Sequence, residues 1–197
     1  MWYNFEGNDS KTVYDLSPRQ IDASLKQGER VPGKFSQSLK LAPGASVVIS
    51  GNDLSFNQSF TLSLWAKILD DAEGTILSNG QARLEYRDDL KLYGSVYTQN
   101  GWEEVSTFAQ QGKWTHYALA LTNSQLMMFI NGDQVSSKNL TTAMTWEDLE
   151  DRDLYLGSPE AINWSMGGNV LLDELRIYDR ALSNACLLYT SPSPRDS

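Results

Sequence analysis

The chain has 197 residues, of which 41% are hydrophobic, and it carries 16 Lys or Arg against 25 Asp or Glu. This length fits one globular domain that buries roughly 70% of its unfolded surface. The net charge of −9 opposes binding to a phosphate backbone and no basic stripe offsets it, so we expect no nucleic-acid partner. No apolar run of about 18 residues predicts a membrane span, and the first residues do not resemble a signal peptide.

The first half of the chain predicts short strands separated by polar turns. Residues 59–69 show the pattern best, because apolar side chains recur at the period-two spacing of a strand. Shorter strands are expected at residues 2–5, 46–50, 74–78, 82–87 and 91–97. Residues 17–28 hold Ile21 and Leu25 at helical spacing, but the segment is too polar to assign a helix.

The second half adds longer strands. Residues 113–121 are apolar on both sides, which predicts a central strand covered on both faces. Residues 125–130 predict a strand and are followed by Asn131-Gly132, whose tolerance of positive φ indicates a hairpin. Residues 153–156 predict a short strand. Residues 170–179 alternate again, with Leu171, Leu175 and Ile177 expected on one side. About ten to twelve short strands favour an antiparallel sandwich or barrel.

Residues 186–197 break with the periodic pattern before them and are rich in Ser and Pro. They resemble an in-frame translation of a sequencing-library adapter, and a natural Pro/Ser-rich linker is the alternative. We therefore expect a non-native, disordered tail at residues 186–197 of a metagenomic fragment, and one domain over residues 1–185. On this interpretation the domain has no cysteine, because Cys186 is the single cysteine of the chain.

Residues 168–183 carry a long motif, Gly-Asn-Val-Leu-Leu-Asp-Glu-Leu-Arg-Ile-Tyr-Asp-Arg-Ala-Leu-Ser. The motif resembles the closing strand of laminin-G-like domains in the concanavalin A-like lectin/glucanase superfamily. Other segments resemble the same family in order, at residues 13–17, 32–39, 60–67, 74–78, 114–118 and 129–132. The resemblance implies an all-β fold, an antiparallel two-sheet β-sandwich of the jelly-roll type, with the first and last strands near one another.

Catalysis is the first function to test, because the superfamily includes glycoside hydrolases. A retaining hydrolase needs two carboxyl groups about 5–5.5 Å apart, which acids at i and i+2 or i+4 on one strand face provide. Residues 173–179 form the best acidic strand and lack that spacing. His116, the single histidine, lies in the most apolar segment, so we expect a buried, hydrogen-bonded core residue rather than a base or zinc ligand. The sequence therefore predicts no enzyme.

One structural calcium ion is expected, because Ca²⁺ binds carboxylate and carbonyl oxygens and relatives with this fold often hold it where the first and last strands meet. The resemblance implies Glu6, Asp15 and Asp173 as the side-chain ligands. The alternative is that Glu6 is exposed, Asp15 caps a turn and Asp173 pairs with a basic neighbour.

Three tryptophans fall in expected loops, where packing explains them less well than in strands: Trp102, Trp146 and Trp164. Aromatic faces bind the C–H groups of sugars, and neighbouring polar groups fix the hydroxyls. The polar partners expected beside them are Asn100, Glu103, Asp148 and Asn163. The alternative for each tryptophan is a loop folded back onto the edge of the sandwich.

The sequence thus predicts a non-catalytic glycan-recognition module of a larger secreted or cell-surface bacterial protein. Carbohydrate is expected to bind through the rim loops, outside the cell. The alternative is a structural or adhesive spacer that contacts other extracellular proteins and binds no sugar, and a glycoside hydrolase is a remote third hypothesis. The fold does not select the glycan, because one sandwich serves many functions.

Overall fold

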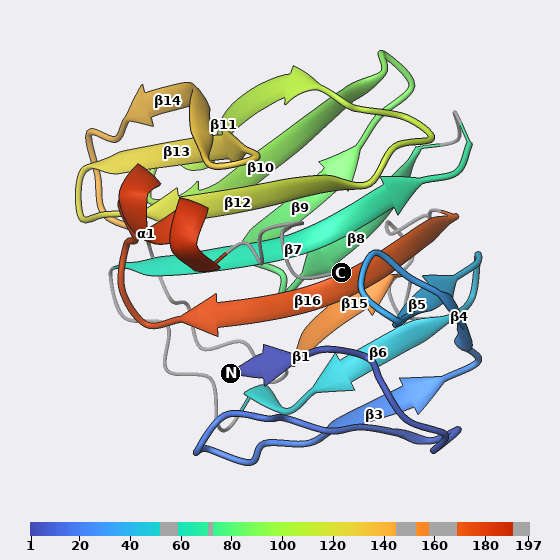
Figure 1. Ribbon diagram of the computed structural model, residues 1–197. Coiled ribbons are helices and arrows are strands. Elements are labelled where there is room, and N and C mark those ends of the chain that lie inside the picture. The colour runs from blue at the N-terminus through green and yellow to red at the C-terminus, as the bar shows by residue number, and fades with distance from the viewer. Residues whose placement is uncertain (52–58, 71–72, 145–152, 158–168, 191–197) are drawn as a thin grey trace.

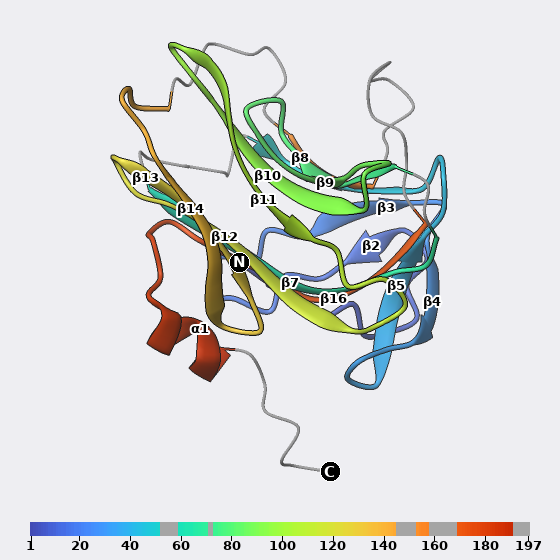
Figure 2. The ribbon, with the colours of Figure 1, turned by 90° about the horizontal axis from the view of Figure 1, so that it is seen from above.

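The computed structural model describes residues 1–51, 59–70, 73–144, 153–157 and 169–190. For residues 188–190 it describes the backbone without the side chains. The chain forms two antiparallel sheets packed face to face, with one short helix near its end (Figures 1 and 2). The predicted all-β sandwich is confirmed. Helix α1 has seven residues, and no helix in the part of the chain that the structure describes could span a bilayer.

Sheet A contains the long central strands of the chain. In spatial order its strands are β14 (Asp133–Asn139), β13 (Gln125–Ile130), β12 (Thr115–Leu121), β7 (Phe60–Ile68), β16 (Val170–Tyr178), β5 (Gln37–Leu41) and β4 (Glu29–Pro32). The short strand β1 (Trp2–Tyr3) also pairs with β16, with Tyr3 opposite Leu175. The expected neighbourhood of the first and last strands is therefore confirmed.

Sheet B forms the other layer. In spatial order its strands are β11 (Gly101–Phe108), β10 (Lys91–Thr98), β9 (Ala82–Tyr86), β8 (Gly74–Ser78), β15 (Leu154–Gly157), β6 (Ser46–Ile49), β3 (Ala23–Lys26) and β2 (Thr12–Val13). Strand β3 lies near the end of residues 17–28, the segment that was too polar to be assigned as a helix. Most expected strands agree with the structure within one or two residues, but β11 replaces an expected loop.

The core lies between the inner faces of the two sheets. Tyr117, Leu119 and Leu121 of β12 face it and are buried. Gly94 of β10 lies opposite Leu119, and a Cβ at Gly94 would come within 2.3 Å of the Leu119 side chain. Glycine is therefore required at Gly94 because the two sheets approach each other closely there.

Strand β12 is buried on both faces, as its sequence predicts. Its outer side chains Ala118 and Ala120 pack with Leu182 and Leu187. Leu187 belongs to helix α1 (Asn184–Thr190), which lies on the side of sheet A that faces away from sheet B (Figure 2). The prediction of disorder is wrong for residues 186–190, because Leu187 is fully buried there. The origin of the tail stays a prediction.

Strand β16 contains a bulge that reverses its alternation. Asp173 lies opposite Trp65 and Arg176 opposite Ser63, so two residues of β16 oppose one residue of β7. Glu174, inside the bulge, has a φ of 51°. The expected grouping of Leu171 with Leu175 and Ile177 is wrong. Leu172 is buried instead and Leu171 is partly exposed, because the extra residue turns the side chains before it to the other face.

Candidate carbohydrate-binding face

Trp102 does not lie in a loop, which corrects the prediction. It is the second residue of strand β11 and pairs with Tyr97 of β10. A turn before Gly101, whose φ is 94°, joins β10 to β11 as a hairpin. Trp146, Asp148, Asn163 and Trp164 lie outside the described residues, so their place in a site stays a prediction.

The three predicted sugar-binding residues that the structure describes point to different places. Trp102 and Glu103 are adjacent on a strand, so their side chains lie on opposite faces of sheet B. The Glu103 carboxylate forms an ion pair with Lys138 of β14, at 2.6 Å. The Asn100 side chain donates a hydrogen bond to the Thr141 hydroxyl, at 3.0 Å. The structure therefore does not bring Asn100, Glu103 and Trp102 together.

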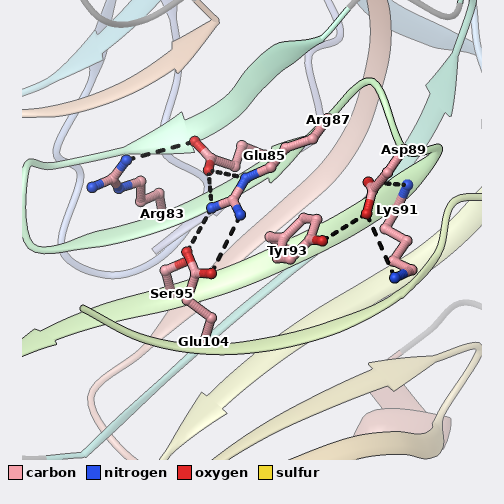
Figure 3. Close-up of polar contacts among 8 residues, drawn as sticks. All are labelled: Arg83, Glu85, Arg87, Asp89, Lys91, Tyr93, Ser95 and Glu104. Carbon is pink, nitrogen blue, oxygen red and sulfur yellow. Dashed lines mark hydrogen bonds and ion pairs between the residues drawn. The ribbon is translucent and has the colours of Figure 1, made fainter.

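Trp102 instead belongs to a layer of polar and aromatic side chains on the outer face of sheet B, the face that points away from sheet A. The layer alternates with core residues such as Leu84 and Val96, which are buried. Figure 3 shows part of the layer above β9, β10 and β11. Its members include Arg83, Glu85, Arg87, Tyr93, Ser95, Tyr97, Trp102 and Glu104.

The Arg87 guanidinium holds two carboxylates of this face together. Its Nη2 donates to Glu85 at 2.6 Å and to Glu104 at 2.5 Å, and its Nη1 donates to Glu104 at 3.3 Å. The Ser95 hydroxyl adds a hydrogen bond to Glu104 at 3.0 Å. The same guanidinium stacks over the Tyr93 ring at 3.8 Å. We call Arg83, Glu85, Arg87 and Glu104 the Arg87 network.

An aromatic corner adjoins the Arg87 network. The Arg83 guanidinium lies 3.5 Å from the centre of the Trp102 ring, a cation–π contact. The Tyr97 ring meets the Trp102 ring edge to face, with centres 5.4 Å apart. Arg83 also approaches Glu85 at 3.8 Å, so the corner and the network are continuous. Tyr97 and Arg83 both contact the Trp102 ring, and part of its surface reaches solvent.

A polar pocket opens beside this corner. It has a volume of about 210 Å³ and is lined by Glu73, Gly74, Thr75, Arg83, Glu85, Tyr86 and Arg87. Charged and hydroxyl-bearing residues make up most of this lining. An aromatic surface beside such groups is the combination that sugar recognition needs.

Glu104 and Arg87 hold each other in their charged forms on this face. Burial alone would raise the pKa of Glu104, but the hydrogen bonds and charge of Arg87 outweigh burial and lower that pKa. The hydrogen bond to Glu104 raises the pKa of Arg87 in turn. A glycosidase needs a carboxylic acid that keeps its proton until it meets the leaving group. Glu104 is held ionised instead, so it does not fit that role.

The expected calcium ligands carry other hydrogen bonds. Asp15 accepts from the Trp2, Ser17 and Ile21 backbone N–H groups, at 2.9, 2.9 and 3.1 Å, so it caps its turn as the alternative predicts. Glu6 accepts from the Gln37 N–H at 3.0 Å. Among the residues placed in the structure, no three His, Cys, Asp or Glu side chains are grouped to hold a metal ion. Calcium therefore stays a prediction.

Asp173 is a fully buried residue on the outer side of sheet A. Its Oδ2 accepts a hydrogen bond from the Phe35 N–H at 2.9 Å, while Oδ1 has no partner among the described residues. Burial raises the pKa of Asp173 to about 7, although the Phe35 hydrogen bond opposes the rise. Asp173 and Glu6 both hold the turn between β4 and β5, Asp173 at Phe35 and Glu6 at Gln37.

His116 is buried, as its sequence context predicts. It lies opposite Trp65 on β7, and the two rings are 5.6 Å apart. Burial, followed by the charge of Arg176, lowers the pKa of His116 to about 4. Nδ1 has no hydrogen-bond partner in the described part of the chain, so the expected side-chain hydrogen bond is not seen at that atom.

Solved structures resemble this sandwich over 95% of its length. The binding domain of Paraclostridial mosquitocidal protein 1 superposes with a TM-score of 0.76 at 17% identity, and the chain covers 50% of it. The ligand-binding domain of botulinum neurotoxin serotype D, solved in complex with N-acetylneuraminic acid, has a TM-score of 0.73 at 14% identity and 49% coverage. A Trypanosoma rangeli sialidase has a TM-score of 0.74 at 18% identity, with 31% coverage.

These likenesses show a shared fold. The chain spans about half the length of the toxin binding domains that it resembles and less of the sialidase. Comparison with curated protein sequences finds no significant match. A profile of the concanavalin A-like lectin/glucanases superfamily matches residues 42–186. The match covers most of the chain and includes the closing motif, so the chain belongs to the laminin-G-like family of that superfamily.

Proposed function

We propose that the domain is a non-catalytic glycan-recognition module, and that carbohydrate binds on the outer face of sheet B around Trp102. The Trp102 ring carries the proposal, because Tyr97 and Arg83 hold it in place beside a polar pocket. A ring held rigidly in advance loses little conformational entropy when it binds a sugar. The site is a strand face rather than the rim loops that the sequence predicts.

The non-catalytic part of the proposal rests on the Arg87 network. The Arg87 guanidinium binds Glu104 and lowers the pKa of its carboxyl group, so Glu104 is held ionised rather than as a proton donor. Several of the similar solved structures are binding domains by name, and one is a sialidase. Their names support glycan recognition as a class.

We further propose that the module belongs to a larger secreted or cell-surface bacterial protein. The toxin binding domains that it resembles are about twice its length, which supports a role beside another domain. Cell-surface glycans are exposed on the outside of cells, so a module that binds them would act outside the cell.

The test is a glycan array with the wild type and Trp102→Ala, with bound glycans confirmed by titration calorimetry. We expect the substitution to weaken binding by about tenfold or more, the effect of a binding hot spot. Phe108→Ala is the matched control, because Phe108 lies on the same face of the same strand and is 67% exposed. It should leave affinity unchanged.

Other outcomes would change the assignment. Wild-type silence across a broad array would favour the spacer hypothesis. Loss of binding in Trp146→Ala or Trp164→Ala, with Trp102→Ala unaffected, would move the site to the rim loops. Cleavage of a bound glycan by the domain alone would contradict the non-catalytic assignment.

A further inference from the structure

The hydrophobic core reaches the surface at one end of the sandwich. Ile68 of β7 in sheet A and Tyr86 of β9 in sheet B both belong to the core. Both also line a hollow of about 70 Å³, which we call the mouth. The other residues that line the mouth are Asp70, Arg87, Leu90, Ala109 and Gln111.

Backbone hydrogen bonds fix the rim of the mouth. The Leu90 N–H donates to the Arg87 carbonyl at 3.0 Å, and the Ala109 N–H donates to the Leu90 carbonyl at 3.0 Å. The Gly112 N–H donates to the Ile68 carbonyl at 2.9 Å. The connections that follow β7, β9 and β11 are therefore tied to one another, so a ligand would meet a preformed surface.

Leu90 has two features that the fold alone does not explain. Its φ is 61°, in the left-handed region that glycine adopts most readily, and the residue is 51% exposed. Among the described non-glycine residues with positive φ, Leu90 is the one that is both apolar and exposed. A binding role explains this leucine, because glycine would form the same turn without strain.

The mouth is small and has an apolar border. Its volume is below the roughly 150 Å³ of a cavity that holds benzene, so it suits the end of one aliphatic side chain. Leu69 is exposed beside it and lines a second hollow with Asp70, Gln111 and Gly112. Exposed apolar residues that gather around a hollow are typical of a surface that binds another protein.

The charge of the mouth favours a cation beside that aliphatic side chain. Two charged residues line the described hollows at this end, Asp70 and Arg87. Arg87 is already bound by Glu85 and Glu104. Asp70 Oδ1 is buried and has no hydrogen-bond partner within the described ranges, although buried polar atoms usually have one. A cationic group that reaches the mouth would pair with Asp70.

We propose that the mouth docks a protein partner, through a segment that inserts one aliphatic side chain beside Leu90 and places a lysine or arginine against Asp70. Trp102 and the mouth lie at opposite ends of strand β11, roughly 20 Å apart at the rise of a strand. The docking surface is therefore separate from the proposed carbohydrate-binding face and does not depend on it.

The first experiment selects peptides from a phage-displayed library of random dodecapeptides on the immobilised wild-type domain. Binders to immobilised Leu90→Gly are removed beforehand. We expect enrichment of Lys or Arg next to Leu, Ile or Val. One enriched peptide is then synthesised and titrated, and its contacts are mapped by NMR chemical shifts. The largest amide shifts should occur at Leu90, Ala109, Gln111 and Gly112.

The second experiment separates binding from folding. Leu90→Gly removes the apolar side chain and suits the left-handed backbone, so the melting temperature should stay the same or rise. The affinity for the peptide should nevertheless fall about tenfold or more. Asp70→Asn keeps the shape and removes the charge, so it should weaken the peptide about threefold to tenfold.

Leu16→Ala is the control for both variants. Leu16 is exposed to a similar extent as Leu90, but it follows β2, at the opposite edge of sheet B from β11. Its substitution should leave the affinity for the peptide unchanged.

The alternative occupants of the mouth have distinct signatures. Amide shifts there that depend on protein concentration alone would assign the surface to a second copy of the chain, and shifts caused there by a glycan would assign it to carbohydrate; either result would overturn the inference. No enriched peptide, enrichment of acidic peptides, or unchanged affinity in Leu90→Gly would overturn it too. Trp102→Ala should leave peptide binding intact, because the two surfaces are separate.

Discussion

The two outer faces of the sandwich have the same alternating pattern, but one is covered and the other is partly exposed to solvent. On sheet A, Ala118, Ala120 and Phe129 are buried under helix α1. On sheet B, Arg83, Trp102 and their neighbours stay partly exposed and pair with one another. Small and apolar outward residues accept a covering helix, whereas charged residues at the same spacing would lose their hydration under one. An outer face is therefore either structural or available for binding.

The largest difference between the faces should appear when an outward aromatic residue is removed from each. Phe129→Ala should cost about 3–5 kcal/mol of unfolding free energy, because the ring is 1% exposed and its loss leaves a cavity. Phe108→Ala on sheet B should change it by less than about 0.5 kcal/mol. Urea unfolding of both variants measures the contrast. Similar values would show that the two faces do not differ in burial.

The second prediction concerns the helix that makes the sheet A face structural. Leu187→Ala should destabilise the domain by about 2–3 kcal/mol, because the side chain is fully buried against Ala118 and Ala120. Cys186→Ala, next to it and exposed, is the control. Equal stability of both variants would mean that α1 does not seal the face.

The third prediction uses the buried titratable groups of sheet A. Asp173 has a raised pKa near 7, so the folded state binds a proton that the unfolded state loses above about pH 4, and stability falls as pH rises from 4 to 7. His116, with its pKa lowered to about 4, acts oppositely: stability rises between pH 4 and 6.5.

Asp173→Asn should remove the fall and leave the rise. The unfolding free energy of the variant relative to wild type should therefore increase between pH 4 and 7, by at most about 1.4 kcal/mol per pH unit. Urea denaturation at several pH values measures it. A constant difference would show that Asp173 is already ionised in the fold at pH 4.

The fourth prediction concerns the sheet B face. Glu104→Gln should cost only about 0.5–1 kcal/mol, because the ion pair with Arg87 is about one-third exposed on both sides. The cost should shrink in high salt, which screens exposed pairs. Thermal unfolding at low and high salt tests both statements. A loss as large as that of Phe129→Ala would mean that this face is structural too.

The last prediction concerns calcium, whose effect should be comparable with that of Glu104→Gln. If the ion binds near Glu6 and Asp173, the melting temperature should be a few degrees higher in millimolar calcium than in excess chelator, because a ligand of the folded state stabilises it. Glu6→Gln should reduce the difference. The same melting temperature under both conditions would remove the calcium proposal.

Much of the fold could be predicted, because its signals are local. The apolar residues on both sides of β12 correctly predict burial on two faces, and Asn131-Gly132 marks a hairpin with both residues at positive φ. Strand β11 was missed because Glu103 and Glu104 suggest a solvated loop. The Asn100-Gly101 pair before it was the available signal, since it is the same kind of hairpin turn.

The candidate site could be predicted only in part. Trp102 was identified from its residue type. Its partners Arg83 and Tyr97 come from β9 and β10, and nothing in the sequence indicates that they lie close to Trp102. The alternation Arg83-Leu84-Glu85-Tyr86-Arg87 was the signal for a charged strand face. Glu103 was wrong as a partner for Trp102, because adjacent residues on a strand point to opposite sides.

The sequence by itself determined the strands, the sandwich class and the family, because these depend on side-chain periodicity and on one long closing motif. Only the tertiary structure decided which outer face is covered, where the bulge in β16 reverses the side chains, and which residues surround Trp102. Those outcomes depend on register between strands far apart in the chain, which local pattern does not encode. The proposed binding face therefore became visible only when β9, β10 and β11 were placed side by side.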